Sequence, residues 1–456
     1  MRADCQEPAS RHGSCLLVSA NRMTLPYPVY PLGIAYLLGA LEARGHQADH
    51  LDILAAGGHE PLRQLLRQKS YDLIGISIRN IDTVDSASRL DLLADITGAM
   101  AVIREESTAP VVLGGPGFSI MPGPLLYHCR ADYGIVGEGE AALPLLLERL
   151  VGGDPPQEKL LAMPAASFPS CTPRYSAEIT PYYLEHGGML NVQSKRGCAY
   201  GCSYCSYPTI EGRVLRHRAA KLVAAEIGEL TKRFGARYIF FTDAIFNDPQ
   251  GRYLELAEAL ACAGNRTPWC AFFRPQNIDR KSLRLLKRSG LAAMEIGTDA
   301  ACDATLTGLG KGFTFDEVAA VHDNILAENI PCAHFVIFGG PGETAATLRQ
   351  GLHNLQRLRR TVVFAYIGIR ILPGTALHRQ AVREGHVDED TDLVASRYYY
   401  SPAISREDIE GTVLADFRGR RDRVYPVADS EKLIPLMHRF GHIGPLWDKL
   451  IPATDR

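Results

Sequence analysis

A short loop holds the residues best suited to chemistry. Residues 196–208, RGCAYGCSYCSYP, place Cys198, Cys202 and Cys205 in a CxxxCxxC spacing, with Tyr204 directly before the last cysteine. Three thiolates do not complete a closed tetrahedral zinc site, which needs four protein ligands. An iron–sulfur cube held by three thiolates leaves one iron open to a substrate or cofactor. The spacing therefore indicates an open metal cluster.

A zinc site on the same loop stays open as an alternative, and His217 is the nearest downstream histidine for a fourth ligand. The other cysteines are scattered along a chain of this size, which argues against a disulfide framework. We expect them to behave as small apolar residues or surface thiols. They are Cys5, Cys15, Cys129, Cys171, Cys262, Cys270, Cys302 and Cys332.

The composition excludes several classes of protein. The chain has 456 residues, 46% hydrophobic and 22% charged, with a formal net charge of −2. A charge so near zero predicts no bulk attraction to nucleic acid or to an anionic membrane. The first fifteen residues are polar and do not resemble a signal peptide, and no apolar run approaches a membrane span. We expect a cytoplasmic protein of two or three domains, with residues 1–13 as a disordered tail.

Residues 14–150 alternate between apolar strands and helices. This pattern predicts an α/β domain with a doubly wound, Rossmann-like parallel sheet, because its strands are continuous apolar runs. Ligands of such sheets bind beyond the carboxyl ends of the strands. The predicted strands are 14–21, 47–54, 72–82, 110–119 and 132–140. The candidate binding residues at their ends are Arg79, Asn80, Asp82, Gly114, Gly115, Gly117, Ser119, Gly137, Glu138 and Gly139.

A second alternation follows a segment, 151–188, that is rich in Pro, Ser and Gly and reads as a linker. Six strand–helix units within 189–385 predict a partial (β/α)6 barrel of the TIM type, whose active end is the carboxyl edge of its strands. The cysteine loop follows the first strand and so lies on that edge. Residues 386–456 form a small extension that could cap the barrel mouth. The predicted strands are 189–195, 236–246, 269–275, 292–299, 332–340 and 363–371.

Two arginines lie near the ends of apolar strands of the predicted barrel. Arg274 ends CAFFR and Arg370 ends YIGIR. A charge at such a place must be paired or lie in a polar cavity. We favour contact with a cofactor carboxylate or with substrate for both, as candidate catalytic residues. A structural ion pair with Glu295 or Asp299 is the competing interpretation.

Two polar residues follow the second barrel strand, and two cations precede the cysteine loop. Asp243 and Asn247 are either cofactor contacts or the cap of the next helix, since Asp and Asn are good N-caps. Lys195 and Arg196 either raise the potential of the cluster or are solvated surface charges.

Four segments after the cysteine loop carry a resemblance to a known family. They are FFTDAIFND (240–248), MEIGTDAA (294–301), HFVIFGGPGET (334–344) and RILPGTAL (370–377). Together with the CxxxCxxC loop, they resemble in order the motifs of radical S-adenosylmethionine (SAM) enzymes. The resemblance implies that the cysteines ligate a [4Fe-4S] cluster whose fourth iron binds SAM. It also implies cofactor contacts at Tyr204, Asp243, Asn247, Asp299 (where Glu is commoner), Gly339 and Gly340.

The N-terminal half resembles the cobalamin-binding domain of one large subgroup of this family. The segments that carry the resemblance are YPLGIAYLLGALEARGH (30–46), GGPGFS (114–119) and GIVGEGEAALP (134–144). No histidine has the spacing of a cobalt ligand, so Arg79 is a candidate for the lower face of the cobalamin, where a guanidinium has no lone pair to donate. The alternative is that Arg79 pairs with Asp82.

The resemblance implies a carbon methyltransferase that uses a 5′-deoxyadenosyl radical and methylcobalamin in specialised-metabolite or lipid biosynthesis. It also implies a small-molecule substrate and an electron donor such as flavodoxin or ferredoxin. The net charge near zero predicts no nucleic-acid partner. One alternative keeps both cofactors but catalyses cyclisation, ring contraction or C–C coupling. A non-catalytic cobalamin or iron–sulfur sensor is the alternative from another class.

Overall fold

The computed structural model describes residues 12–163, 168 and 171–452, so most of the predicted N-terminal tail lies outside the described residues. The described chain forms two compact units. The first comprises the described parts of Met1–Arg22, Pro31–Ile81 and Asp91–Ile179. The second comprises those of Met23–Tyr30, Asp82–Leu90 and Thr180–Arg456. The first domain is therefore not the contiguous stretch 14–150, because two short segments within that range belong to the second unit.

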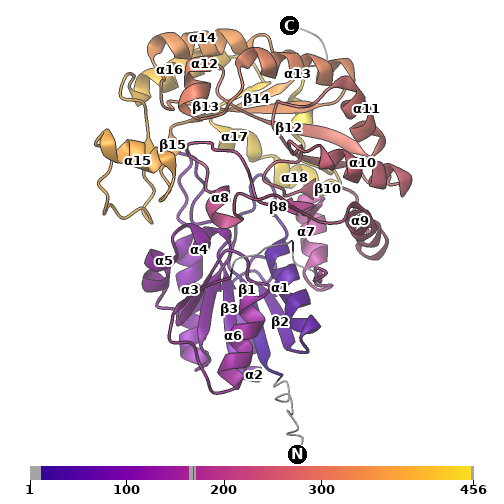
Figure 1. The fold of residues 1–456 in the computed structure, drawn as a ribbon, viewed down its shortest axis with the longest axis vertical. Coiled ribbons are helices and arrows are strands. Elements are labelled where there is room, and N and C mark those ends of the chain that lie inside the picture. Colours follow the sequence, from indigo (N-terminus) through magenta and orange to yellow (C-terminus); the bar gives the residue numbers. More distant parts are fainter. Residues whose placement is uncertain (1–11, 164–167, 169–170, 453–456) are drawn as a thin grey trace, which may run out of the picture. The chain divides into compact units, whose positions relative to one another are not determined.

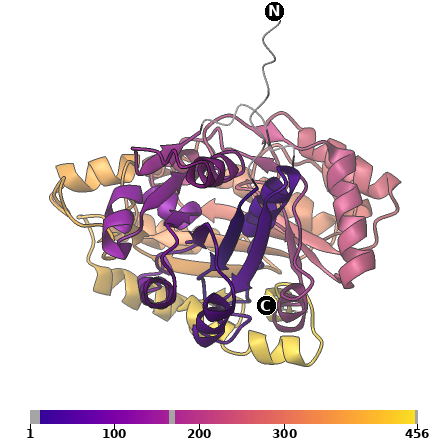
Figure 2. The ribbon, with the colours of Figure 1, turned by 90° about the horizontal axis from the view of Figure 1, so that it is seen from below.

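The first unit is built on a six-stranded parallel sheet with helices on both faces (Figures 1 and 2). All five predicted strands are present. Apolar side chains of the central strands pack against helices α1 and α6 in one buried core. In spatial order the strands are β2 (Gln47–Asp52), β1 (Ser14–Ser19), β3 (Leu73–Ser77), β4 (Val111–Gly114), β5 (Tyr133–Val136) and β6 (Leu160–Ala162). The helices are α1 (Leu32–Ala43), α2 (Glu60–Gln68), α3 (Leu93–Glu106), α4 (Pro116–Ile120), α5 (Pro122–Cys129) and α6 (Ala142–Val151).

The predicted linker 151–188 contains regular structure in its described part. Strand β6 pairs in parallel with β5, and α7 (Thr180–Gly187) is a helix of the second unit. The linker interpretation was therefore wrong for these two elements. Strand β6 has only three residues, none of them buried, so its sequence carries little apolar signal.

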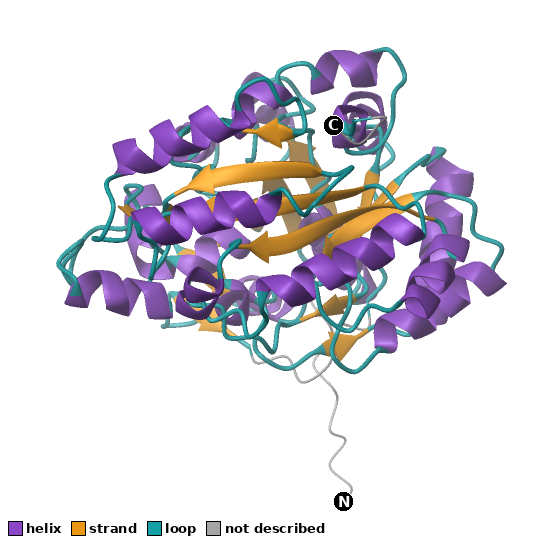
Figure 3. Ribbon diagram, turned by 90° about the horizontal axis from the view of Figure 1, so that it is seen from above, coloured by secondary structure: helices purple, strands orange, loops and turns teal. Residues whose placement is uncertain are grey.

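The second unit is built on a seven-stranded, all-parallel sheet whose strands are flanked by helices in the manner of an open barrel (Figure 3). The six predicted strands are confirmed. A seventh, β17, pairs with β14 and comes from the C-terminal extension. In spatial order the strands are β7 (Leu190–Val192), β10 (Ile239–Phe241), β11 (Trp269–Phe273), β12 (Leu291–Asp299), β13 (Cys332–Phe338), β14 (Val362–Ile367) and β17 (Arg423–Val424).

Several helices of the second unit begin at a residue whose side chain caps the first turn. Asp279 accepts a hydrogen bond from the Ser282 backbone N–H at the start of α11, and Thr314 with Glu317 forms a capping box at α13. The helices of the second unit include α9 (Ala220–Phe234), α10 (Arg252–Cys262), α11 (Arg280–Arg288), α12 (Asp303–Gly308), α13 (Phe315–Ala327), α14 (Ala345–Leu355) and α16 (Arg406–Phe417). The shorter elements are β8 (Lys195–Arg196), α8 (Tyr207–Ile210), β9 (Arg216–His217), α15 (Ala376–Arg383), α17 (Val427–Glu431) and α18 (Ile434–Arg439).

The C-terminal extension contributes to both ends of the barrel. At the carboxyl edge, β15 (Ile369–Arg370) pairs with β16 (Tyr398–Tyr399). At the opposite end, Trp447 of the 3-10 helix η1 (Trp447–Leu450) packs against residues at the amino ends of the barrel strands. The end of the extension therefore closes the floor of the barrel, and the prediction that it caps the mouth was wrong for this segment. Within the described chain, no helix combines the length and apolar character needed to cross a membrane.

Candidate cofactor site

The cysteine loop follows β8 at the carboxyl edge of the barrel and is fastened by backbone hydrogen bonds. The Cys198 N–H donates to the Gly212 carbonyl at 3.1 Å, and the Ser203 N–H donates to the Leu309 carbonyl at 2.9 Å. Gly197 begins the loop with φ = +92°, and a Cβ there would lie 2.2 Å from the Val214 carbonyl oxygen. Only glycine suits that position, so the local sequence fixes where the first cysteine enters the site.

A buried ion pair lies beside the loop. The Lys311 ammonium pairs with Asp299 and donates to the Cys202 sulfur at 3.3 Å. Burial opposes the charged form of Lys311, but Asp299 and Cys202 outweigh this effect and raise the pKa of the ammonium. Burial, aided by Asp299, raises the pKa of Tyr204 well above its ordinary value. The site therefore holds one fixed positive charge next to a cluster cysteine.

The buried thiols of the loop do not ionise readily by themselves, but they are suited to bind a metal cluster. Burial raises the pKa of Cys205 to about 12 and raises that of Cys198, so both are protonated at neutral pH without metal. Lys311 acts in the opposite direction on both sulfurs. A metal that replaces the protons would gain thiolate ligands in a pocket that already carries compensating positive charge. This donor set fits an iron–sulfur cluster.

Arg274 lies next to the same loop. Its guanidinium stacks over the Tyr200 ring at 4.0 Å and over the Phe313 ring at 4.7 Å, and its Nε donates to Gln276 Oε1 at 2.6 Å. Its Nη1 is buried and has no hydrogen-bond partner among the described residues. The predicted ion pair of Arg274 with Glu295 or Asp299 was wrong. Glu295 bonds the Trp447 indole and Asp299 pairs with Lys311.

Arg370 is engaged by the protein itself. Its Nε donates to Asp82 Oδ2 at 2.7 Å, and its two terminal nitrogens donate to the carbonyls of Ile371 and Leu393. Glu295 and Asp299, the partners proposed from the sequence, have other contacts. With three donors committed to this network, Arg370 acts as a structural clamp at the carboxyl edge. Its role as a catalytic contact is not supported by this geometry.

Asp243 ties the second strand to the start of the cysteine loop. Its carboxylate accepts hydrogen bonds from the backbone N–H groups of Ser194 and Lys195, from the Ser194 hydroxyl and from Lys195 Nζ. The Asn247 side chain bonds the backbone of Arg274 in both directions. The helix-cap interpretation was wrong for both residues, because α10 begins only after Gly251. Their contact with a cofactor stays a prediction.

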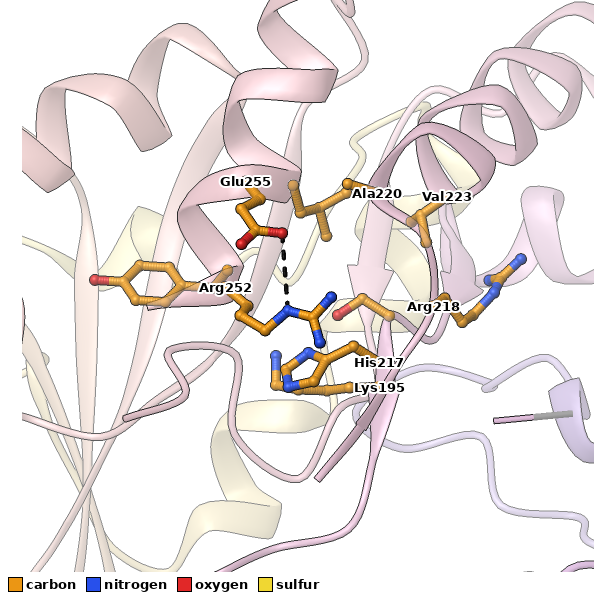
Figure 4. A pocket seen from close by; sticks show the side chains of 10 residues that line it. Lys195, His217, Arg218, Ala220, Val223, Arg252 and Glu255 are labelled. Carbon is orange, nitrogen blue, oxygen red and sulfur yellow. Dashed lines mark ion pairs between the residues drawn. The ribbon is translucent and has the colours of Figure 1, made fainter. Parts of the chain in front are cut away.

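The two cations before the loop are buried, and the surface-charge interpretation was therefore wrong for both. Lys195 pairs with Asp243 and also donates to the Phe246 carbonyl at 2.6 Å, while Arg196 donates to Gln193. His217 lies with Lys195 in a small pocket between α9 and α10, near the ion pair of Arg252 and Glu255 (Figure 4).

This position of His217 bears on the zinc alternative. Among the described residues, the group of ligands close enough to share one ion is formed by His322, Cys332 and His334, and it includes neither His217 nor the loop cysteines. The loop therefore lacks the fourth ligand that a closed zinc site would need.

Two glycines follow β13 at the same edge. Gly339 has φ = +85°, and its N–H donates to Glu343 at 3.4 Å. A Cβ on Gly340 would lie 3.3 Å from both Ile369 and Leu309. Burial raises the pKa of Glu343. The contact of these glycines with adenine remains a prediction.

The first unit gathers its predicted residues at the carboxyl edge of its own sheet. Gly115 has φ = +97°, and a Cβ there would lie 2.7 Å from the Ile78 carbonyl oxygen. The Ser119 hydroxyl donates to the Gly115 carbonyl and accepts from the Gly137 N–H, each at 2.9 Å. This network joins the loops that follow β4 and β5. Gly114, Glu138 and Gly139 lie on the same two loops.

Arg79 and Asn80 follow β3 directly, and the Arg79 Nε donates to Asn80 Oδ1 at 3.0 Å. The predicted pair of Arg79 with Asp82 was wrong, since the Asp82 carboxylate is bound by Arg370 and Ser396. Sequence reasoning missed this use of Asp82. It also missed Lys311, for which the only signal is a lysine between two glycines in GLGKGF.

Two family models match the regions that contain the glycine loops of the first unit and the cysteine loop of the second. Residues 18–147 match the family model of the B12 binding domain, and residues 192–353 match that of the Radical SAM superfamily. The chain is a cobalamin-binding radical SAM enzyme. Its two matched domains make cobalamin and SAM its cofactors.

Several relatives of this radical SAM enzyme cover most of its length. Tryptophan 2-C-methyltransferase from Streptomyces laurentii is 25% identical, over 82% of this chain and 75% of the relative. Cytidylyl-2-hydroxyethylphosphonate methyltransferase from Streptomyces wedmorensis is 21% identical, over 89% of each chain. The solved structure of the methyltransferase TsrM from Kitasatospora setae, with cobalamin and a [4Fe-4S] cluster bound, has a TM-score of 0.86 at 22% identity. It covers 96% of this chain and 97% of TsrM.

Proposed function

We propose that this enzyme transfers a methyl group to a carbon atom of a small molecule, with cobalamin and SAM as cofactors. The observation that carries the proposal is the presence, in one chain, of a B12 binding domain and a radical SAM domain whose cysteine loop lies at the carboxyl edge of its barrel. Two relatives that align over most of this chain are methyltransferases by name, one of them a C-methyltransferase, which supports the same reaction class.

The cofactors supply the reactive chemistry when bound: the cluster passes one electron to SAM, and cobalamin carries the methyl group. The protein's own residues bind and orient them. Cys198, Cys202 and Cys205 would hold the cluster, and Lys311 would keep a positive charge beside one ligand sulfur. Arg274 would bind the cofactor carboxylate through its unpartnered Nη1.

The first unit would receive cobalamin on the glycine loops after β4 and β5. Gly115 and Gly137 carry no side chain at these two positions, so a corrin ring could approach the backbone there. Arg79 would lie at the lower face, where its guanidinium offers cobalt no lone pair. An electron donor such as flavodoxin or ferredoxin would reduce the cluster.

The test is anaerobic reconstitution followed by product analysis. The enzyme with iron, sulfide and cobalamin is incubated with SAM, a chemical reductant and L-tryptophan, the substrate named for one relative, within a panel of small aromatic and phosphonate acceptors. We expect S-adenosylhomocysteine and a methylated acceptor. Formation of 5′-deoxyadenosine without any S-adenosylhomocysteine would instead indicate a non-methylating radical reaction. Cofactor binding without either product across the panel would favour the sensor.

A cysteine variant separates the two cofactor sites. Replacement of Cys198, Cys202 and Cys205 by alanine should remove the cluster iron and all product, with corrinoid uptake retained by the first unit. The matched control is Cys262→Ala, an exposed cysteine at the end of α10, which should retain both. Product formation by the triple variant would contradict the assignment of the loop.

A further inference from the structure

A cluster of metal-ligating side chains lies behind the barrel sheet, at the amino end of β13 and away from the cysteine loop. His322 comes from α13, while Cys332 and His334 are the first and third residues of β13. Residues two apart on a strand point to the same face, so the cysteine and the second histidine both face the helix. All three side chains are buried, with exposed fractions of 2% or less.

The distances within this His322–Cys332–His334 cluster match those of ligands around one ion. His322 Nδ1 lies 3.1 Å from His334 Nε2. The Cys332 sulfur lies 3.7 Å from the first nitrogen and 4.0 Å from the second. A tetrahedral zinc ion with bonds of roughly 2.0–2.1 Å to nitrogen and 2.3 Å to sulfur separates its ligands by about 3.3 Å (N to N) and 3.6 Å (N to S).

The outer nitrogens of both imidazoles are held as in metal sites. His322 Nε2 lies 3.0 Å from the Arg359 carbonyl oxygen. A carbonyl only accepts, so this nitrogen carries the proton and Nδ1 turns its lone pair toward the cluster. His334 Nδ1 lies 2.7 Å from the Thr298 hydroxyl. Metal-bound histidines usually donate their other N–H to a carboxylate, a backbone carbonyl or water, and the Arg359 carbonyl is such a partner for His322.

The charge states agree with this arrangement. Burial lowers the pKa of His322 and lowers that of His334 well below its ordinary value, so both rings are neutral ligands at pH 7. Burial raises the pKa of Cys332 to about 12, so its thiol is protonated in the metal-free protein. The charged groups that act on the histidines are Asp323, Arg359 and Arg423, and the last is paired with Asp422 at 2.9 Å.

We propose that His322, Cys332 and His334 form a structural zinc site that ties α13 to β13. On binding, Zn²⁺ would replace the thiol proton, which is released to solvent, and the two neutral imidazoles would donate their lone pairs. His334 would carry its proton on Nδ1 and donate it to Thr298. A closed tetrahedral site needs a fourth ligand. The Thr361 hydroxyl, 3.4 Å from the Cys332 sulfur, would supply it. Burial excludes substrate, so the role is structural.

The competing arrangement is a metal-free hydrogen-bonded trio. In it, His334 Nε2 carries the proton and donates to His322 Nδ1, while Thr298 donates to His334 Nδ1. Both arrangements satisfy the same distances between heavy atoms. Metal content and ligand type distinguish them.

The experiment measures zinc in the full-length enzyme with its cluster and cobalamin in place. Elemental analysis reports zinc separately from the iron of the cluster and the cobalt of the corrinoid. We expect about one zinc per chain after growth with added zinc. Zinc-edge X-ray absorption should show one sulfur at roughly 2.3 Å and two nitrogens at roughly 2.0 Å.

Three variants locate the ion. Cys332→Ser and His334→Gln should each lose the zinc, whereas Cys270→Ser, at a buried cysteine of β11, should retain it. The Cys198, Cys202 and Cys205 triple variant should lose iron and retain zinc, which makes the result independent of the proposed function. Wild-type enzyme should unfold at a higher temperature when zinc-loaded than when zinc-depleted, and Cys332→Ser should show no such shift.

Three results would overturn the proposal. The first is wild-type enzyme that contains less than about a tenth of an equivalent of zinc and takes up no added Zn²⁺. The second is zinc content that is unchanged in both site variants. The third is an absorption spectrum with three sulfur ligands, which would place the ion on the cysteine loop. If the site variants do not fold, the wild-type spectrum decides between one sulfur and three.

Discussion

Glu295 is a buried carboxyl group on the inner side of the barrel, and its removal should change the pH dependence of stability. Its Oε1 accepts a hydrogen bond from the Trp447 indole at 3.0 Å. Burial raises its pKa from 4.5 to about 7, and the indole bond only partly offsets this effect. Between these two values the folded protein holds a proton that the unfolded chain has lost. Stability therefore falls as pH rises from 4.5 through 7.

The magnitude follows from the size of the shift. A difference of about 2.5 pH units at 1.36 kcal/mol each gives about 3 kcal/mol, which the folded second unit loses fully above pH 7. Glu295→Gln keeps an oxygen for the Trp447 indole and carries no titrating proton. We expect the variant to gain about 3 kcal/mol relative to wild type when pH is raised from 4.5 to 8.

Tryptophan fluorescence reports this change selectively. The chain has two tryptophans, Trp269 and Trp447, and both belong to the second unit. Urea unfolding of both proteins is followed anaerobically at several pH values between 4.5 and 8. The control is Glu258→Gln, an exposed carboxyl group on α10. Parallel stability profiles for wild type and Glu295→Gln would refute the reasoning, because they would show that Glu295 titrates alike in the folded and unfolded chains.

Three further changes test the two cofactor sites and their support. Gly115→Ala places a Cβ 2.7 Å from a carbonyl oxygen at φ = +97°. It should lower the free energy of unfolding by about 1–3 kcal/mol and reduce cobalamin loading in a corrinoid titration. In the control Gly123→Ala the new Cβ meets no atom within 4 Å, so this variant should bind cobalamin normally. Lys311→Met removes a positive charge 3.3 Å from Cys202, so redox titration should show a more negative cluster potential. Asp243→Asn removes the anionic partner of a buried lysine and should destabilise the second unit by about 3–5 kcal/mol in the fluorescence assay.

The sequence predicts those parts of the fold whose signal is local. The strands of both sheets are continuous apolar runs, so eleven of them are readable without a structure. Strands β6 and β17 are not, because β6 is three residues long without a buried side chain and β17 is the dipeptide Arg423–Val424. Each pairs along an existing strand through backbone hydrogen bonds, which place few demands on side chains.

In the candidate site, too, the residues that are close in sequence could be predicted and the long-range pairs could not. The three cysteines lie within one short loop, so their spacing alone indicates the cluster. The partner of Arg370 is Asp82, which is 288 positions earlier in the chain, and no periodic pattern connects them. Sequence reasoning proposed nearer carboxylates because it had no information on which loops meet at the carboxyl edge. The pairing of Lys311 with Asp299 was missed for the same reason.

The placement of buried charge at this edge distinguishes Arg274 from Lys195, Lys311 and Arg370. Buried cations require a partner, and Lys195, Lys311 and Arg370 each have a carboxylate. Arg274 has two aromatic rings and an amide, with no carboxylate within ion-pair distance among the described residues.

Arg274→Lys should therefore weaken binding of SAM, because a lysine keeps the charge but loses the planar fork and the stacking. Loss of a charged hydrogen bond of about 1.5–3 kcal/mol corresponds to a roughly 10- to 150-fold weaker affinity, measured by anaerobic equilibrium dialysis of the iron-loaded enzyme. Iron content should be unchanged, and Arg288→Lys, at an exposed arginine of α11, should bind as wild type. Equal affinity in the Arg274 variant would mean that the cofactor carboxylate is bound elsewhere, and the stacked guanidinium would then serve to hold Tyr200 and Phe313 against the cysteine loop.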